Sequence, residues 1–187
     1  MAGTKKRAFP LAQVYRLLEP GSVVLVTTTT RTGRANVMPM SWHTMMEFVP
    51  PIVGCVISGR NHTFEILRAT GECVINLPTV ELAEKVVGCG NTSGRQVDKF
   101  KTFGLTPVAA AVVKAPLIAE CYANLECKVI DQRLAAQYNF FILEVVKAWI
   151  DPRQKHPRTM HHQGEGMFLI AGRTISLPSP KTSFLTK

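Results

Sequence analysis

Short runs of β-branched and apolar residues recur along this chain, and turn residues separate them. Ser22–Thr30 carries the run Val-Val-Leu-Val followed by four threonines, which predicts a strand. Gly33 within Arg31–Arg34 predicts a hairpin turn, and Ala35–Trp42 returns as a second strand with Pro39 marking an edge or a bulge. Further strands are predicted over Ile52–Ser58, Glu72–Leu77, Val108–Val113, Ile118–Asp131, Tyr138–Ile150 and Gly166–Leu177.

Helical patterns are few and short. They cover Pro10–Leu18, Asn61–Thr70 and Thr79–Val87, and Gly71 is placed to end the second of these helices. A glycine-rich loop over Gly88–Gly94 follows the third. Long helices do not alternate with the strands and no Gly-x-Gly-x-x-Gly fingerprint is present, which argues against a doubly wound sheet. The predicted fold is therefore mainly β, a β-barrel decorated with short helices.

The length of 187 residues suits one domain, and the composition of 46% hydrophobic and 19% charged residues excludes a disordered, collagen-like or coiled-coil chain. No apolar run approaches the ~20 residues that a membrane-spanning helix needs. We expect a soluble, cytoplasmic protein. Residues 1–187 are predicted to form a single domain with a core over about 20–175, a basic N-terminal extension and a C-terminal tail from about residue 178.

The formal net charge of +9 is concentrated toward the two ends of the chain. Residues 1–34 hold six Lys and Arg against one acid, residues 151–187 hold six against two, and residues 35–150 hold ten of each. A basic surface attracts nucleotides and phosphorylated cofactors as well as nucleic acids. Because no nucleic-acid-binding motif accompanies the charge, a nucleic-acid role is disfavoured, although a cofactor-free nucleic-acid-binding barrel stays open as an alternative.

The five cysteines form no Cys-x-x-Cys pair, so neither a disulfide framework nor a zinc site is predicted, and free core cysteines are expected. His156, His161 and His162 lie close together without a cysteine or carboxylate at ligand spacing, and no metal site is predicted there. Two interpretations stay open: a loop that covers a ligand, or an exposed polar loop.

The segment Ser58–Thr63 joins a predicted buried strand to the start of a helix. Free backbone N–H groups and the helix dipole attract anions at such a position, and Arg60 can bind a phosphate with its guanidinium fork. The alternative is purely structural, with Asn61 capping the helix and Arg60 as a surface charge.

Two further segments are candidates for ligand contacts. Asn36–Trp42 places apolar and hydrogen-bonding groups on one strand against which a planar ligand can lie, although a core strand with a buried Trp42 would have the same sequence. The loop Cys89–Gly94, followed by Lys99, allows close backbone approach and supplies a positive charge, but it lacks the Gly-Lys-Ser/Thr of a P-loop.

Together, these segments resemble the flavin reductase-like, FMN-binding split-barrel family, especially its flavoredoxin-type branch. The resemblance is carried by the ordered series RANVMPMSWH, PPIVGCVISGRNHTFEILRATGECVINLP and VDKF, and by AECYANLECKV and FILEVVKAWID further along. It runs over about residues 20–175. It implies a split β-barrel that works as a homodimer and holds FMN non-covalently.

The resemblance also assigns cofactor contacts. Asn36 and its strand would line the flavin ring, and the segment after Ser58 would bind the phosphate. Tyr138 stands where the family often has a histidine, so a proton-transfer role for that position is in doubt. The full set of implied FMN contacts is Asn36, Val37, Met38, Pro39, Ser41, Trp42, Ser58, Arg60, His62, Thr63, Ser93, Lys99, Phe100, Tyr138 and Phe168.

The resemblance implies an NAD(P)H-dependent flavin oxidoreductase in which flavin N5 carries the hydride, so no catalytic side chain is assigned. A redox partner protein or a monooxygenase is a further implied partner. A flavoredoxin-type electron carrier, receiving electrons from a protein partner, is the alternative within the same fold.

Overall fold

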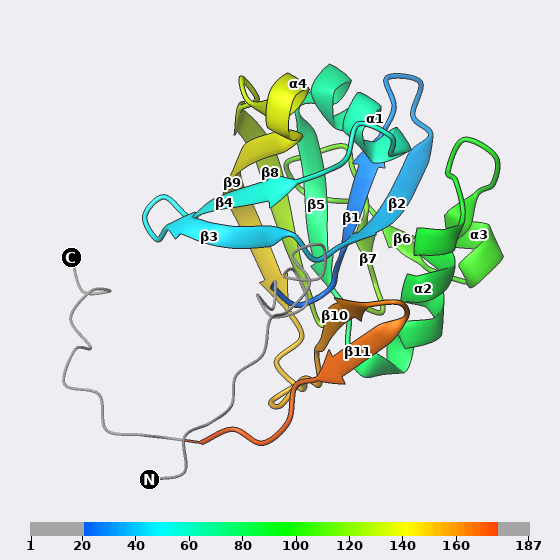
Figure 1. Cartoon of the computed structure of the whole chain (residues 1–187), viewed down its shortest axis with the longest axis vertical. Coiled ribbons are helices and arrows are strands. Elements are labelled where there is room, and N and C mark those ends of the chain that lie inside the picture. Colours follow the sequence, from blue (N-terminus) through cyan, green and yellow to red (C-terminus); the bar gives the residue numbers. More distant parts are fainter. Residues whose placement is uncertain (1–20, 176–187) are drawn as a thin grey trace, which may run out of the picture.

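The computed structural model describes residues 21–175, and the predicted helix Pro10–Leu18 and the tail from about residue 178 lie outside this range. A seven-stranded antiparallel sheet in the order β2-β1-β5-β8-β9-β4-β3 curls into a split barrel (Figure 1). Two small two-stranded sheets, β10-β11 and β6-β7, accompany it. The strands of the large sheet are β1 (Val24–Thr29), β2 (Ala35–Met40), β3 (His43–Glu47), β4 (Ile52–Val56), β5 (Glu72–Leu77), β8 (Ala123–Asp131) and β9 (Phe140–Ile150).

The shorter elements lie around this sheet. The small sheets consist of β6 (Pro107–Val108) with β7 (Leu117–Ile118), and of β10 (Met160–Gly164) with β11 (Met167–Ile170). The helices are α1 (His62–Thr70), the 3-10 helix η2 (Val80–Leu82), α2 (Ala83–Asn91), α3 (Lys99–Phe103) and α4 (Ala135–Tyr138). Within residues 21–175, no helix is long and apolar enough to cross a membrane.

The split in the barrel lies between two strands that are neighbours in the sequence. β2 and β3 form opposite edges of the sheet, although only Ser41 and Trp42 separate them along the chain. The curled sheet therefore brings its two edges together at this crossing without pairing them. β2 keeps one unpaired edge, and such an edge presents backbone polar groups to whatever covers it.

Both faces of β1 are covered, which explains why its sequence is apolar at consecutive positions rather than alternating. Val24 and Val26 belong to one buried cluster, with residues of β4, β5, β8, β9 and α1. Val23 and Leu25 belong to a second cluster, with residues of α2 and α3. In the first cluster the rings of Phe64 and Phe141 meet edge to face, with centroids 5.3 Å apart.

Several sequence predictions are confirmed. β1, β2, β4 and β5 lie within or match their predicted ranges, and the Arg31–Arg34 turn has Gly33 at φ 87°. α1 ends at Gly71, whose φ of 71° is the left-handed conformation that glycine adopts without strain. All five cysteines are buried and free.

Other predictions are wrong. Of the strand predicted over Val108–Val113, only Val108 is in a strand, because the N–H groups of Ala111, Val112 and Val113 donate to the Glu126 carboxylate (3.0, 2.6 and 3.1 Å) instead of to a neighbouring strand. A turn interrupts the predicted strand Ile118–Asp131 between β7 and β8.

The predicted boundaries also fail around three shorter elements. α2 continues to Asn91, so most of the predicted Gly88–Gly94 loop is helical, and η2 and α2 replace the single predicted helix. β9 lies within the predicted strand Tyr138–Ile150, but Tyr138 itself ends α4. The last strand stops at Ile170, and His161 and His162 lie on β10 rather than in a loop.

Candidate functional site

Three adjoining hollows surround the crossing between β2 and β3. The cationic hollow has a volume of about 230 Å³ and is lined by Asn36, Met38, Arg60, Asn61, His62, Thr63, Cys89, Gly90, Asn91, Thr92, Ser93, Gly94, Arg95 and Lys99. The strand hollow, of about 290 Å³, is lined by Met38, Pro39, Met40, Ser41, Trp42, Val56, Ser58, Asn61 and Asn139. The apolar hollow, of about 430 Å³, is lined by Val23, Pro39, Met40, Ser41, Val86, Val87, Gly90, Asn91, His162, Gly166 and Phe168. Because neighbouring hollows share lining residues, the three adjoin one another along the end of β2.

The cationic hollow is a positively charged site. Arg60, Arg95 and Lys99 line it, and no carboxylate is among its lining residues within the described part of the chain. Such a lining favours an anion with several acceptor oxygens, such as a phosphate.

The start of α1 opens into this hollow. Asn61 is the N-cap residue and Arg60 is exposed, as the structural alternative expected, but the Asn61 side chain makes no capping hydrogen bond. The Ser58 Oγ accepts from the Arg60 N–H (3.3 Å), and the Asn139 Oδ1 accepts from the Gly59 N–H (2.9 Å). These bonds fix the loop before the helix without a side-chain cap at Asn61, and helix N–H groups left uncapped are suited to bind an anion.

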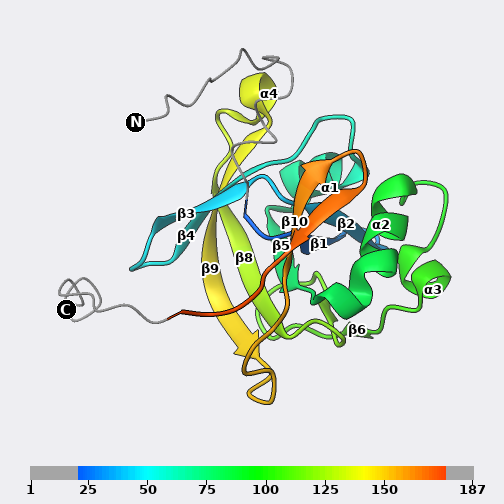
Figure 2. The ribbon, with the colours of Figure 1, turned by 60° about the horizontal axis from the view of Figure 1, so that its bottom comes forward.

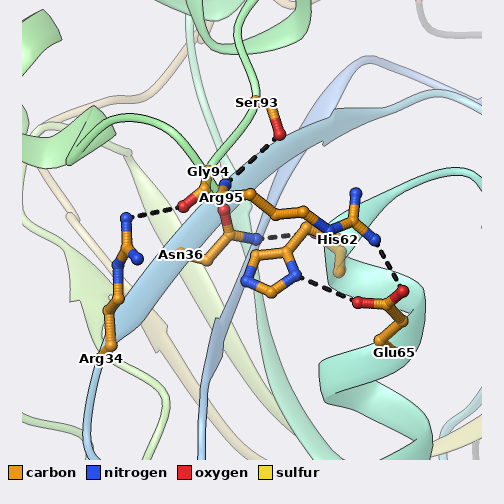
Figure 3. A network of polar contacts seen from close by, with 8 residues as sticks. Arg34, Asn36, His62, Glu65, Ser93, Gly94 and Arg95 are labelled. Atoms are coloured by element: carbon orange, nitrogen blue, oxygen red, sulfur yellow. Dashed lines mark hydrogen bonds and ion pairs between the residues drawn. The ribbon is translucent and has the colours of Figure 1, made fainter.

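Asn36 and Thr63 meet beneath the hollow, and both are buried. The Asn36 Nδ2 donates to the Thr63 Oγ1 at 2.9 Å (Figure 3). The Asn36 Oδ1 is buried without a hydrogen-bond partner within the described residues. A Cβ on Gly94 would lie 1.9 Å from this oxygen, so only glycine fits here. A buried acceptor without a donor is costly in a folded protein, which indicates that a ligand or a water supplies the donor.

Lys99 is a buried cation. Its side chain is only 6% exposed, and Nζ donates to the carbonyls of Val37 (2.9 Å) and Cys89 (2.6 Å). The Val37 carbonyl lies on edge strand β2, so Lys99 joins this strand to the end of α2. Burial lowers the pKa of Lys99 and raises the pKa of the Cys89 thiol to about 11 despite the neighbouring ammonium. A buried ammonium bonded to neutral carbonyls attracts an anion strongly.

An ion-pair network borders the hollow on the α1 side. Glu65 pairs with Arg95 at 2.7 Å and with His62 at 3.4 Å (Figure 3). The hydrogen bonds from Arg95 and His62 lower the pKa of the Glu65 carboxyl. Arg34 donates from Nη2 to the Gly94 carbonyl at 2.9 Å. These contacts hold the 93–95 loop against α1 and β2.

The strand hollow lies along the crossing itself. Trp42 lines it and is 54% exposed, so the alternative of a core strand with a buried Trp42 is wrong. The Trp42 carbonyl accepts from the Val56 N–H at 2.9 Å, which fixes the backbone of the crossing on β4. Backbone and side chains of residues 38–42 thus form an open, partly apolar wall on which a planar group can lie.

The apolar hollow lies between α2 and the hairpin β10-β11. In Figure 1 this hairpin, in orange, lies beside α2 and below β1. Val86 and Val87 come from α2, and His162 and Phe168 come from the hairpin. His162 and Phe168 are paired across the two strands, and their ring centroids are 5.1 Å apart.

Most of the residues assigned from the resemblance line these hollows. Val37, Phe100 and Tyr138 line none of the three. Val37 and Phe100 are buried in the second apolar cluster, and Val37 contributes its backbone carbonyl to Lys99. Tyr138 is exposed at the end of α4, where its hydroxyl accepts from Gln137 (3.1 Å).

Sequence reasoning did not single out Arg34, Arg95 or Asn139 as parts of the same region, and it considered His162 only as part of a loop that covers a ligand. Arg95 carried one usable signal, because it follows directly on the glycine-rich segment. Asn139 carried another, since asparagine often takes the left-handed conformation that ends a helix, and its φ here is 58°. Arg34 had no local signal.

The model of the flavin reductase like domain matches residues 16–168. The uncharacterized protein YddH of Escherichia coli (strain K12) is 32% identical over 179 residues, which cover 89% of this chain and 95% of that protein.

Two solved structures are similar over nearly the whole chain. One is an FMN-binding domain of a flavin reductases-like enzyme from Shewanella baltica, with a TM-score of 0.80 and 30% identity, covering 92% of this chain and 97% of that one. The other is the flavoredoxin of Desulfovibrio vulgaris (Miyazaki F), with a TM-score of 0.78 and 22% identity over 98% of both chains, which shows a shared fold.

Proposed function

The chain belongs to the flavin reductase-like family, and we propose that it is an FMN-dependent oxidoreductase that passes electrons from NADH or NADPH to flavin or another acceptor. The support comes from the family and from the chemistry of the three hollows. The observation that carries the FMN assignment is the unpartnered Asn36 Oδ1 beside a cationic hollow.

The phosphate of FMN suits the cationic hollow. Arg60, Arg95 and Lys99 supply positive charge, Thr63 supplies a hydroxyl, and the start of α1 supplies N–H groups. The Lys99 ammonium has three N–H donors and donates to two carbonyls, so one N–H is available to a phosphate oxygen.

The buried Asn36 Oδ1 needs a donor. The ribityl hydroxyls and the imide N–H of FMN are both donors, whereas a bare phosphate dianion has none. A nucleotide-like ligand that extends from the phosphate site toward β2 can supply this donor directly, whereas an inorganic dianion would leave it to a water.

The flavin ring suits the wall formed by residues 38–42, where the strand hollow and the apolar hollow meet. The unpaired edge of β2 offers backbone donors and acceptors to the polar edge of such a ring. Bound FMN would supply the redox chemistry, and the residues of this chain would bind the flavin, orient it and limit its contact with water.

We further propose that the chain forms a homodimer through the β3-β4 hairpin. The side chains at its end are apolar and exposed, including Met45 (53%), Phe48 (62%) and Val49 (84%). Figure 2 shows this hairpin projecting away from α2 and α3. A cluster of exposed apolar side chains of this kind is typical of a protein–protein contact.

The visible absorbance spectrum of the purified protein, followed by anaerobic addition of NADH and then of NADPH, tests the main proposal. Prompt bleaching of an oxidised-flavin spectrum supports a reductase and identifies the donor. A spectrum that bleaches only with dithionite favours the electron carrier instead. A colourless protein that also fails to bind added FMN overturns the flavin assignment.

The phosphate assignment has its own test. Replacing both Thr63 and Lys99 with Ala removes the hydroxyl and the buried ammonium, and we expect the dissociation constant for FMN to rise by about 100-fold, the effect of losing two polar contacts. Titration of the apoprotein with FMN by flavin fluorescence measures it. Unchanged affinity in the double variant excludes this phosphate site.

A further inference from the structure

The apolar hollow is suited to a flat organic ring. Val23, Val86, Val87 and Phe168 provide apolar walls, and its volume of about 430 Å³ exceeds that of a single six-membered ring with a substituent. Pro39, Met40 and Ser41 line both this hollow and the strand hollow. A ring bound here would therefore lie next to the proposed flavin site.

His162 is the one titratable side chain among the residues that line this hollow within the described part of the chain. Its ring contacts the Phe168 ring (5.1 Å between centroids, 46° between planes). His162 is half-buried in this lining. A polar side chain in a mostly apolar pocket is typical of a residue that orients a ligand.

The hairpin that carries His162 is anchored. The Met160 carbonyl accepts from the Val23 N–H at 2.7 Å, and the Met160 side chain is buried. The Thr159 carbonyl accepts from the Ala171 N–H at 2.8 Å, and Phe168 packs against the second apolar cluster. The backbone that carries the imidazole is thus held in place before any ligand arrives, which lowers the entropic cost of binding.

We propose that the apolar hollow binds a flat ring that carries a carbonyl or carboxamide oxygen, and that His162 selects this ligand by a hydrogen bond to that oxygen. The inference rests on the proposed function, because it places a reaction partner of the flavin. Both the nicotinamide ring of the electron donor and a carbonyl-bearing aromatic acceptor have this chemistry.

The test compares two probes of similar shape, acetophenone and ethylbenzene, of which only the first has a carbonyl oxygen. Each is titrated into the apoprotein and the FMN-loaded protein, and NMR shifts of the Val23, Val86 and Val87 methyl groups report binding. In the His162→Phe variant, which keeps an aromatic ring, we expect the preference for acetophenone over ethylbenzene to fall about fivefold, the effect of one hydrogen bond. His162→Gln, which keeps a polar N–H, should retain much of that preference.

His156→Phe is the matched control, because His156 is exposed and does not line the hollow. An unchanged probe preference in His162→Phe, or acetophenone-induced shifts confined to other parts of the protein, overturns the inference. Circular dichroism of both His162 variants checks that they fold.

A parallel titration with NADH distinguishes the two sources of the ligand. If His162→Phe also weakens NADH binding and acetophenone competes with NADH, the hollow holds the nicotinamide ring. If only acetophenone is affected, the hollow holds the acceptor. FMN titration of the same variants separates this inference from the proposed function. Normal FMN binding together with an unchanged probe preference contradicts the role of His162 and leaves the FMN assignment intact.

Discussion

The Asn36 side chain donates to the Thr63 hydroxyl at 2.9 Å while its own Oδ1 is buried without a partner. The bond joins edge strand β2 to the first turn of α1, the two elements between which the cationic hollow opens. One amide therefore both fixes the position of the helix start and presents an unused acceptor to the ligand.

Replacing Asn36 with Leu removes both the bond to Thr63 and the unpaired acceptor, and the two roles are then measured separately as stability and as FMN affinity. The variant loses the bond to Thr63, which costs about 0.5–1.5 kcal/mol, but it also removes an unpaired buried acceptor whose desolvation costs about 1–3 kcal/mol. We expect the unfolding free energy of the apoprotein to change little and the dissociation constant for FMN to rise about tenfold. Urea denaturation and FMN titration measure the two quantities. A variant that loses stability but keeps its FMN affinity would show that Asn36 is only structural.

Gly94 is required by its contact with Asn36. Alanine at this position would place Cβ 1.9 Å from the Asn36 Oδ1, so we expect Gly94→Ala to cost about 1–3 kcal/mol of stability and to weaken FMN binding. Adding Asn36→Ala removes the clashing atoms, and the double variant should be more stable than the sum of the two single effects predicts. Denaturation of all three variants provides this comparison.

Gly172→Ala is the control for that cycle, because no heavy atom lies within 4 Å of the Cβ that it would add. Strict additivity of Gly94→Ala and Asn36→Ala would contradict the proposed contact.

Glu126 stabilises the 111–113 segment. Burial opposes its ionisation, but hydrogen bonds from the backbone of this segment and from Trp149 Nε1 outweigh that effect and lower the pKa of the carboxyl. A carboxyl with a lowered folded-state pKa contributes stability above its unfolded pKa of about 4.3, and this contribution is lost as the pH falls through the folded-state value.

Glu126→Gln therefore has a pH-dependent effect. At pH 7 we expect a loss of about 1–3 kcal/mol, because an amide has only one acceptor oxygen for several donors. The difference from the wild type should shrink as the pH falls below about 4.3, where the unfolded chain takes up the proton, and it should vanish once the pH has fallen through the lower pKa of the folded carboxyl. Urea denaturation at pH 7 and at successively lower pH measures this difference. An equal loss of unfolding free energy at every pH would mean that the charge of Glu126 does not contribute to stability.

The β3-β4 hairpin is predicted to carry the contact between two copies of the chain. Replacing Met45 and Phe48 with Ser removes two exposed apolar side chains and should raise the dimer dissociation constant by about tenfold or more. Sedimentation velocity over a range of concentrations measures this constant. Val108→Ser removes an exposed apolar side chain from β6 and is the control. A wild type that is monomeric at all concentrations contradicts the dimer.

Sequence reasoning succeeded where a segment's local chemistry decides its structure. The β-branched run in β1 and the β5 segment form strands, and Gly33 and Gly71 take the left-handed conformations that their turns require. It failed where a distant group overrides local preference. The β-rich 108–113 segment is irregular because Glu126, from a different strand, takes its N–H donors.

The sequence by itself therefore determined β1, β2, β4 and β5 and the turns at Gly33 and Gly71, and it pointed to residue types that suit a phosphate, because these depend on side chains close together in the chain. Only the tertiary structure decided which of these residues share a site. Curling of the sheet brings the β2 edge to α1, buries Lys99 between β2 and α2, and leaves the Asn36 Oδ1 unpartnered. It also places His162, about 120 residues beyond β2, in the lining of the adjoining apolar hollow. Such contacts arise from the packing of the whole sheet, and no local pattern in the sequence encodes them.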